Sequence, residues 1–322
     1  MALNKIAFKI QEYGTLVMFK HTIFSLSFGL VSLLLATGGT FLNVWQFILI
    51  LVALLSARTG ANAINRAIDS EIDAANPRTA TRQIPMGRMH KKEALLLGIV
   101  CFVVMVASAW MINPLCGMLS PLALLLMWGY SYMKRFTWLC HIVLGVTCGI
   151  APLGAWLAVT GDFGGLTAVF HSLGEFDFPE AQEAFVYAIQ YDNVIFIPLA
   201  LFFANATWVA GFDVIYATQD FEHDRANGIH SIPAKFGIKG ALYISSALHF
   251  IAVVCLLVAG VLSPFLSIVY FIAIVIIGVL LIYEHSIVKP DNLARATIAS
   301  YSINEIIGIV FMVFSIVDIL VL

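Results

Sequence analysis

Long apolar stretches recur along the whole chain and are separated by short polar segments. Each stretch has about the length that an α-helix needs to cross roughly 30 Å of hydrocarbon. Because lipid offers the backbone no hydrogen-bond partners, these stretches must be helices rather than open strands. Nine spans are predicted, at 22–40, 44–68, 94–112, 115–133, 138–160, 194–216, 240–261, 264–284 and 297–321. The pattern predicts an all-α polytopic membrane protein, with 1–322 as a single integral membrane domain.

Composition supports the membrane class, since 61% of the 322 residues are hydrophobic and only 11% are charged. A soluble domain carries about 25% charged residues. One long connection, at about 161–193, departs from the apolar pattern because it contains several glycines and acidic residues. We expect it to be an extracytoplasmic loop with one short interfacial helix over its mildly amphipathic stretch at 179–190.

Basic residues are distributed asymmetrically between the connections. All 17 lysines and arginines fall in the N-terminal arm, in the connections after the second, fourth, sixth and eighth spans, or at the adjoining span ends. The 161–193 connection has none and is acidic. Lysine and arginine concentrate on the cytoplasmic side of membrane proteins. We therefore expect a multi-pass protein of the cell inner (plasma) membrane, with its N-terminus in the cytoplasm and its C-terminus outside.

An acidic segment ends the second predicted span. Asn65, Asp69 and Asp73 are spaced by four residues, so on a continuous helix they stack along one face. Such a set of oxygen donors suits Mg²⁺, which usually takes one or two carboxylates together with substrate phosphates and waters.

Three arginines accompany this segment. Arg58 precedes Asn65 by seven residues and falls on the same helix face. Arg78 and Arg82 follow in a polar connection. Guanidinium groups suit phosphate oxygens because they donate paired hydrogen bonds.

A second acidic segment ends the sixth span, with Asp213, Tyr216, Asp220 and Asp224 near one helix face. Either segment alone also fits a solvated acidic helix end. Together they favour function, because ionisable residues at membrane depth are costly and usually mark a site. Two carboxylate faces with arginines nearby indicate divalent cations and a polyanion, such as a diphosphate, between them.

These residues resemble the UbiA superfamily of intramembrane prenyltransferases. The resemblance covers essentially the whole chain and includes the NxxxDxxxD motif at 65–73, a DxxxD motif preceded by Asp213, and Tyr130-Ser-Tyr132-Met-Lys134-Arg135 after the fourth span. It implies nine helices around a central cavity that opens to the cytoplasmic side and laterally to lipid.

The resemblance also implies roles for individual residues in transfer of a polyprenyl group from its diphosphate. Two Mg²⁺ ions would be held by Asn65, Asp69, Asp73, Asp213, Asp220 and Asp224. The diphosphate would be bound by Arg78, Arg82 and Lys134, and the carbocation stabilised by Tyr130 and Tyr216. The residues expected to be catalytic are Asp69, Asp73, Asp213, Asp220, Tyr130 and Tyr216. Arg58 would pair with the carboxylate of an aromatic acid acceptor.

The leading expectation is a 4-hydroxybenzoate polyprenyltransferase-like enzyme of ubiquinone or menaquinone biosynthesis. One alternative acceptor is a naphthoate-type or futalosine-derived compound of a menaquinone route. Haem O and chlorophyll synthesis are less expected, because no features specific to a macrocycle are evident. The alternative of another class is a secondary transporter that binds ions through its intramembrane carboxylates. The expected partners are polyprenyl diphosphate, an aromatic acid and membrane lipid, and no nucleic acid.

Overall fold

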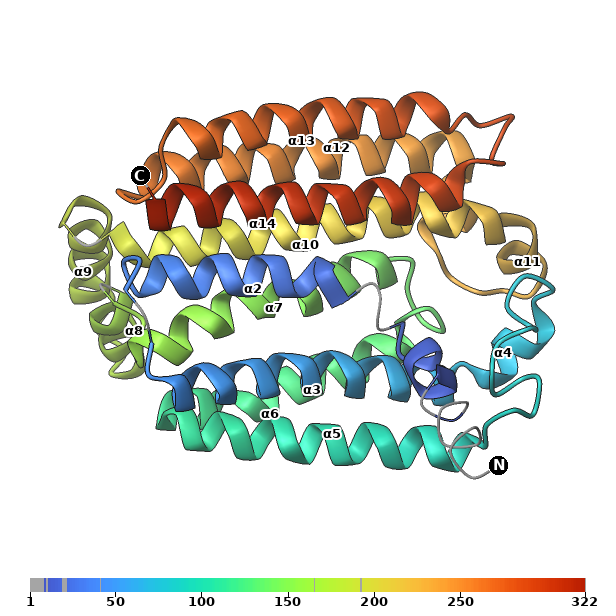
Figure 1. The fold of residues 1–322 in the computed structure, drawn as a ribbon, viewed down its shortest axis with the longest axis horizontal. Coiled ribbons are helices and arrows are strands. Elements are labelled where there is room, and N and C mark those ends of the chain that lie inside the picture. The colour runs from blue at the N-terminus through green and yellow to red at the C-terminus, as the bar shows by residue number, and fades with distance from the viewer. Residues whose placement is uncertain are drawn as a thin grey trace.

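Long helices run side by side through the chain (Figure 1). The computed structural model describes residues 9, 11–18, 22–40, 42–164, 166–191 and 193–321. The α-helices are α2 (Ile23–Ala36), α3 (Val44–Ile68), α4 (Ser70–Ala75), α5 (Lys91–Ile112), α6 (Pro114–Met133), α7 (Cys140–Thr160), α8 (Leu166–Gly174), α9 (Phe178–Tyr191), α10 (Phe196–Ala217), α11 (Phe221–Ala226), α12 (Ile232–Leu262), α13 (Ile268–Ile287) and α14 (Asn304–Val321). Short 3₁₀ segments η2 (Asn193–Ile195) and η3 (Thr218–Asp220) flank α10, and a π-helical segment η4 (Ile298–Ile303) leads into α14.

The predicted all-α membrane architecture is confirmed. Among the described residues, eight helical segments are long and apolar enough to cross a membrane. The first predicted span, at 22–40, instead contains the shorter helix α2 of 14 residues. The longest segment that connects successive long helices is the one between α7 and α10, and the connections after α3 and α10 each contain a short helix.

Helix boundaries differ from the predicted ones where local capping decides them. The seventh span was expected from 240, but α12 begins at Ile232 because the Ser231 side chain accepts a hydrogen bond from the Ala234 amide. Gly237, with φ of 72°, interrupts the helical backbone before the span proper. The 161–193 connection forms two helices, α8 and α9, where one was expected.

The described core centres on α10. This helix packs against α7 on one side and α12 on the other, while α2, α13 and α14 complete that half of the bundle. Phe28, Trp208 and Phe311 meet there, with the Phe28 ring 5.5 Å from Trp208 and 4.3 Å from Phe311 between centroids. Helices α3, α5 and α6 form the other flank, which reaches α10 through α7.

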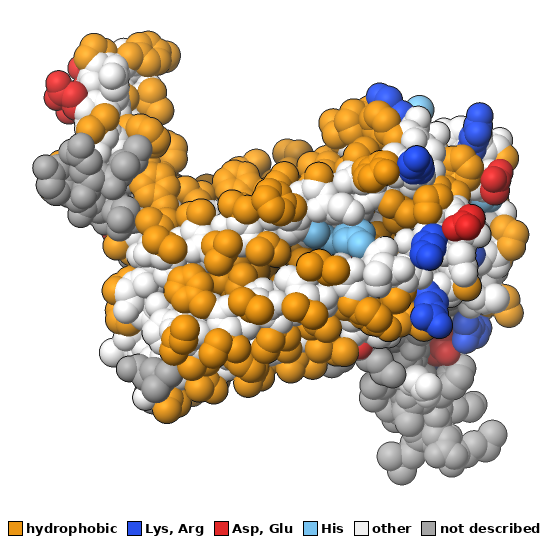
Figure 2. Space-filling model, turned by 90° about the horizontal axis from the view of Figure 1, so that it is seen from above, with side chains coloured by type: hydrophobic (Ala, Val, Ile, Leu, Met, Phe, Trp, Pro, Cys, Tyr) orange, Lys and Arg blue, Asp and Glu red, His pale blue; other side chains and the backbone are white. Residues whose placement is uncertain are grey.

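The two ends of the bundle differ in charge. Figure 2 shows lysine and arginine side chains gathered at one end of the visible face, and the α8–α9 hairpin projecting from the other. The short helices α4 and α11 lie at the charged end, whereas the C-terminal end of α14 lies at the same end of the molecule as α8 and α9 (Figure 1). The motif segments that end α3 and α10 are therefore brought to the same end of the molecule.

Helices α7 and α10 approach each other unusually closely. A β-carbon at Gly145 would lie 2.1 Å from the Ala206 carbonyl oxygen, and one at Gly149 would lie 2.8 Å from the Phe202 carbonyl oxygen. Glycines four residues apart let two membrane helices bring their backbones together. No side chain fits at Gly145 unless the two helices separate.

We therefore expect Gly145→Ala to lower the thermal midpoint of the purified protein in detergent, through overpacking of about 1–3 kcal/mol. Gly154→Ala, on the same helix, is the matched control, because nothing lies within 4 Å of a β-carbon there. Equal midpoints for the two variants would contradict the close packing.

Candidate functional site

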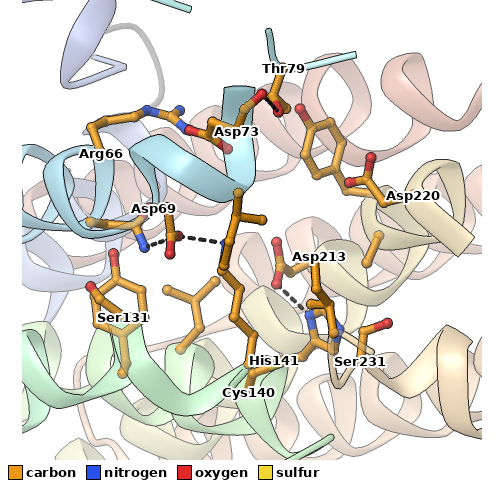
Figure 3. A pocket seen from close by; sticks show the side chains of 18 of the residues that line it. Arg66, Asp69, Asp73, Thr79, Ser131, Cys140, His141, Asp213, Asp220 and Ser231 are labelled. Atoms are coloured by element: carbon orange, nitrogen blue, oxygen red, sulfur yellow. Dashed lines mark hydrogen bonds and ion pairs between the residues drawn. The ribbon is translucent and has the colours of Figure 1, made fainter. Parts of the chain in front are cut away.

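A polar cavity of about 270 Å³ opens at the charged end of the bundle, between α3, α4, α6, α7, α10 and α11. Every site residue predicted from the sequence lines it, namely Arg58, Asn65, Asp69, Asp73, Arg78, Arg82, Tyr130, Lys134, Asp213, Tyr216, Asp220 and Asp224. In Figure 3, Asp69 and Asp73 face the cavity from one side, and Asp213 and Asp220 from the other. The fold thus joins two sequence segments that lie about 140 residues apart.

The sequence suggested that the first acidic segment is one continuous helix, but the structure shows an interruption. Helix α3 ends at Ile68, and Asp69 adopts φ of −85° and ψ of 0° before α4 begins. The α-helical hydrogen bonds from Asp69 to Asn65 and from Asp73 to Asp69 nevertheless persist, at 2.9 and 2.8 Å. The three side chains therefore still reach one cavity.

Asp69 is paired with two cations. It is 4% exposed, and its oxygens meet the Lys134 ammonium at 2.7 Å and the Arg135 guanidinium at 3.2 Å. The Asn65 amide donates to it at 2.9 Å. These contacts fasten the end of α6 to the end of α3.

Asp73 is equally buried but less completely satisfied. One of its oxygens pairs with Arg82 at 2.7 Å, while the other lies 4.0 Å from Arg66. That second oxygen is buried and has no hydrogen-bond partner among the described residues. This oxygen is available to coordinate a metal ion or to accept a hydrogen bond from a ligand in the cavity.

Across the cavity, Asp220 pairs with Arg78. The Arg78 Nε–H donates to it at 2.7 Å, a second guanidinium N–H also donates to it, and the Asn76 amide donates at 2.7 Å. Arg78 also donates to the Tyr216 hydroxyl and lies 4.4 Å from the Tyr216 ring centroid. Burial opposes the charge on Arg78, but the hydrogen bonds to Asp220 raise the pKa of its guanidinium above the usual value. Arg78 is therefore a permanent cation at the cavity edge.

Asp213 has a partner that was not predicted. The His141 Nδ1 lies 2.7 Å from a carboxylate oxygen of Asp213, as the dashed line in Figure 3 marks. His141 was not among the site residues expected from the sequence. Its only sequence signal was its place at the start of α7, at the same end as the motifs.

Arg58 lies deeper, where the polar cavity meets a second and larger one. That apolar cavity, of about 520 Å³, is formed chiefly by α3, α5, α6 and α7. Five residues line both cavities, namely Arg58, Asn62, Tyr130, Leu144 and Cys148. The polar cavity therefore adjoins the apolar cavity, and Arg58 and Tyr130 lie at the junction of the two.

The predicted metal ligands fit Mg²⁺ in their chemistry. All six offer oxygen donors, which Mg²⁺ prefers, and Asp73 has a buried carboxylate oxygen still without a hydrogen bond. Within the described part of the chain, no three His, Cys, Asp or Glu side chains converge closely enough to hold an ion by themselves. The set therefore suits ions that a phosphate ligand helps to coordinate, as is usual for Mg²⁺.

Comparison with known proteins places the chain among prenyltransferases. Residues 25–306 match the UbiA prenyltransferase family. A 4-hydroxybenzoate octaprenyltransferase of Aeromonas hydrophila is 26% identical over 266 residues, which are 83% of this chain and 81% of that protein. A protoheme IX farnesyltransferase of Desulforudis audaxviator is 32% identical over 157 residues, 46% of this chain and 48% of that protein.

Solved structures of UbiA homologs are also similar to this chain. The apo structure of a UbiA homolog from Aeropyrum pernix K1 is 31% identical, with a TM-score of 0.73 over 93% of this chain and 98% of that one. A UbiA homolog from Archaeoglobus fulgidus, bound to GPP and Mg²⁺, is 18% identical and shares the fold, with a TM-score of 0.67 over 96% of this chain and 99% of that one. The family match spans most of the chain and both motif segments, so this protein belongs to the UbiA prenyltransferase family.

Proposed function

We propose that this chain transfers a polyprenyl group from its diphosphate to a hydroxylated aromatic acid that resembles 4-hydroxybenzoate. The observation that carries the proposal is the meeting of the polar and apolar cavities at Arg58 and Tyr130. A prenyl diphosphate has a polyanionic head and an apolar tail, which match the two cavities. The bond between them is the one that must break.

The polar cavity suits the diphosphate. Arg78, Arg82 and Lys134 would bind its oxygens, and each now neutralises a carboxylate in the same wall. Mg²⁺ held by the acidic residues would stabilise the negative charge on the departing diphosphate. The Archaeoglobus homologue bound to GPP and Mg²⁺ supports this assignment.

The apolar cavity suits the prenyl chain, because its lining is almost entirely aliphatic and aromatic. Tyr130 lies at its inner end, and Tyr216 lies in the polar cavity with its ring 4.8 Å from that of Tyr301. An aromatic face attracts a cation through its quadrupole. The two tyrosines would therefore stabilise positive charge on the prenyl carbon while the acceptor ring attacks it.

Arg58 would select the acceptor. An arginine at the inner end of a largely apolar cavity suits a carboxylate, which it can bind through two parallel hydrogen bonds. The Aeromonas relative, named for 4-hydroxybenzoate, supports a small aromatic acid. A naphthoate-type acceptor of a menaquinone route is the alternative, and the protoheme IX farnesyltransferase relatives show that acceptors vary among similar chains.

A secondary transporter does not fit these observations. Transporters of that kind hold ions near mid-membrane on interrupted helices. Here the carboxylates gather at one end of the bundle, beside the cations expected for a diphosphate. We further propose that this end is cytoplasmic, because the lysines and arginines are concentrated there.

Replacing Asp69 or Asp220 by Ala should reduce prenyl transfer by at least about 100-fold, because each change removes a proposed ligand of the Mg²⁺ that stabilises the leaving group. The measurement is Mg²⁺-dependent transfer of radiolabelled geranyl diphosphate to 4-hydroxybenzoate in membranes. Glu71→Ala and Glu222→Ala are matched controls, since these carboxylates are exposed on α4 and α11 outside the cavity. Full activity in Asp69→Ala and Asp220→Ala would refute the enzyme assignment.

Arg58→Ala should raise the KM for aromatic acids while leaving the KM for the prenyl diphosphate nearly unchanged. Comparison of 4-hydroxybenzoate with 4-hydroxybenzyl alcohol, which has no carboxylate, separates the two contributions. The substitution should raise the KM for 4-hydroxybenzoate but not the KM for 4-hydroxybenzyl alcohol. Undiminished use of carboxylate acceptors by the variant would disprove the role of Arg58.

The proposed topology predicts the behaviour of two full-length fusions in bacterial cells. Green fluorescent protein fused to the N-terminus should fluoresce, and alkaline phosphatase fused to the C-terminus should be active, because phosphatase matures outside the cytoplasm. Inactive phosphatase at the C-terminus, together with fluorescence from the same protein fused there, would reverse the orientation of that end.

A further inference from the structure

His141 presents an unsatisfied nitrogen to the polar cavity. Its side chain comes from the first turn of α7, is 7% exposed, and lines the cavity beside Asp213 (Figure 3). Nδ1 is held by Asp213 at 2.7 Å, whereas Nε2 is buried and has no hydrogen-bond partner in the part of the chain that the structure describes. A buried polar atom without a partner is unfavourable and is rare in folded proteins.

Among the described residues, the only polar side chain besides Asp213 that interacts closely with the imidazole is that of Cys140. The Cys140 thiol lies next to the imidazole, but it donates to the His230 carbonyl oxygen at 3.4 Å, and a thiol is a weak partner in any case. The contact with Asp213 fixes the ring orientation, as a carboxylate on one imidazole nitrogen commonly does. His141 therefore lines the cavity with a fixed ring and a buried Nε2 whose hydrogen-bonding capacity is unused.

The depth of His141 separates it from the cations expected to bind the diphosphate. Its partner Asp213 lies on α10, seven residues before Asp220 in η3, which corresponds to about 10 Å along a helix axis. Asp220 is the residue that pairs with Arg78 at the cavity edge. His141, which is paired with Asp213, therefore lies deeper in the cavity than the Arg78–Asp220 pair, and Arg58 lines the same cavity.

The wall between His141 and Arg58 has a suitable length for one aromatic ring. His141, Leu144 and Cys148 all line the cavity from α7, and Arg58 lies beside Cys148. His141 and Cys148 are separated by seven residues, a rise of about 10 Å. That separation is comparable to a hydroxybenzoate with one hydrogen bond at each end.

We infer that His141 Nε2 forms a hydrogen bond with a ring hydroxyl of the acceptor while Arg58 binds the carboxylate at the other end of the ring. The inference rests on the proposed function and adds the hydroxyl as a second recognition element. A hydroxyl can both donate and accept, so it satisfies Nε2 in either role. His141 is thereby a positioning residue that favours aromatic acids carrying a hydroxyl group.

The test is equilibrium binding of 4-hydroxybenzoate and of benzoate to the purified full-length protein, without prenyl transfer. Wild type should prefer 4-hydroxybenzoate by about tenfold, the contribution of one hydrogen bond. His141→Asn keeps an amide where Nδ1 meets Asp213 but has no atom at the Nε2 position, so its preference should fall to about one. His141→Gln places its amide near the Nε2 position and should restore part of the preference.

His249→Gln is the matched control, because His249 is a buried histidine on α12 whose two nitrogens contact His285 and the Trp208 carbonyl. It should retain the wild-type preference. Retention of the preference by His141→Asn would overturn the inference, as would an equal loss of affinity for both ligands. An increase in the KM for prenyl diphosphate alone would also overturn it, because Nε2 would then serve the diphosphate. Failure of the proposed function is distinguishable, since wild type itself would then transfer to no hydroxylated aromatic acid.

Discussion

Burial of several carboxylates around one small cavity is the constraint on which this end of the molecule depends. Asp69 and Asp73 are each 4% exposed, and like charges repel strongly where water is excluded. Such a group is tolerated only if cations compensate it. The compensation comes from Arg78, Arg82 and Lys134, which belong to parts of the chain other than the helices that carry the carboxylates. The Lys134–Asp69 pair joins the end of α6 to the end of α3. The Arg78–Asp220 pair joins the connection after α4 to η3, which follows α10. A polyanionic substrate would compete for these same cations, and the carboxylates that it released would then be free to hold Mg²⁺, which would offset the added negative charge.

The remainder of the cavity system separates two chemical environments. Charged and amide side chains surround the chamber at the end of the bundle, and aliphatic side chains of α3, α5, α6 and α7 surround the larger space beyond it. Arg58 and Tyr130 occupy the junction because each lies deeper along its helix than the motif residues that follow it in sequence. The bond between a polar head and an apolar tail would be held at this junction without any further domain.

Much of this structure could be predicted from the sequence. Hydrophobic length alone located the membrane helices, because crossing hydrocarbon imposes a nearly fixed length. The four-residue spacing of Asn65, Asp69 and Asp73 predicted that they face one way, which holds despite the interruption at Asp69. The pairing of His141 with Asp213 was not predictable, since it depends on how α7 and α10 cross and not on any local pattern. The early start of α12 was missed, because the Ser231 cap begins the helix before the hydrophobic pattern does. The second helix in the 161–193 connection was also missed.

The close crossing of α7 and α10 has a consequence for the chemistry of the cavity. Gly145 lies one turn beyond His141 on α7, and its contact Ala206 lies two turns before Asp213 on α10. The crossing therefore fixes the position of the His141 imidazole relative to the Asp213 carboxylate. A larger residue at Gly145 would change that spacing even in a protein that still folded. Selection at this glycine would then act on the reaction as well as on the packing, although the glycine itself has no chemically active side chain.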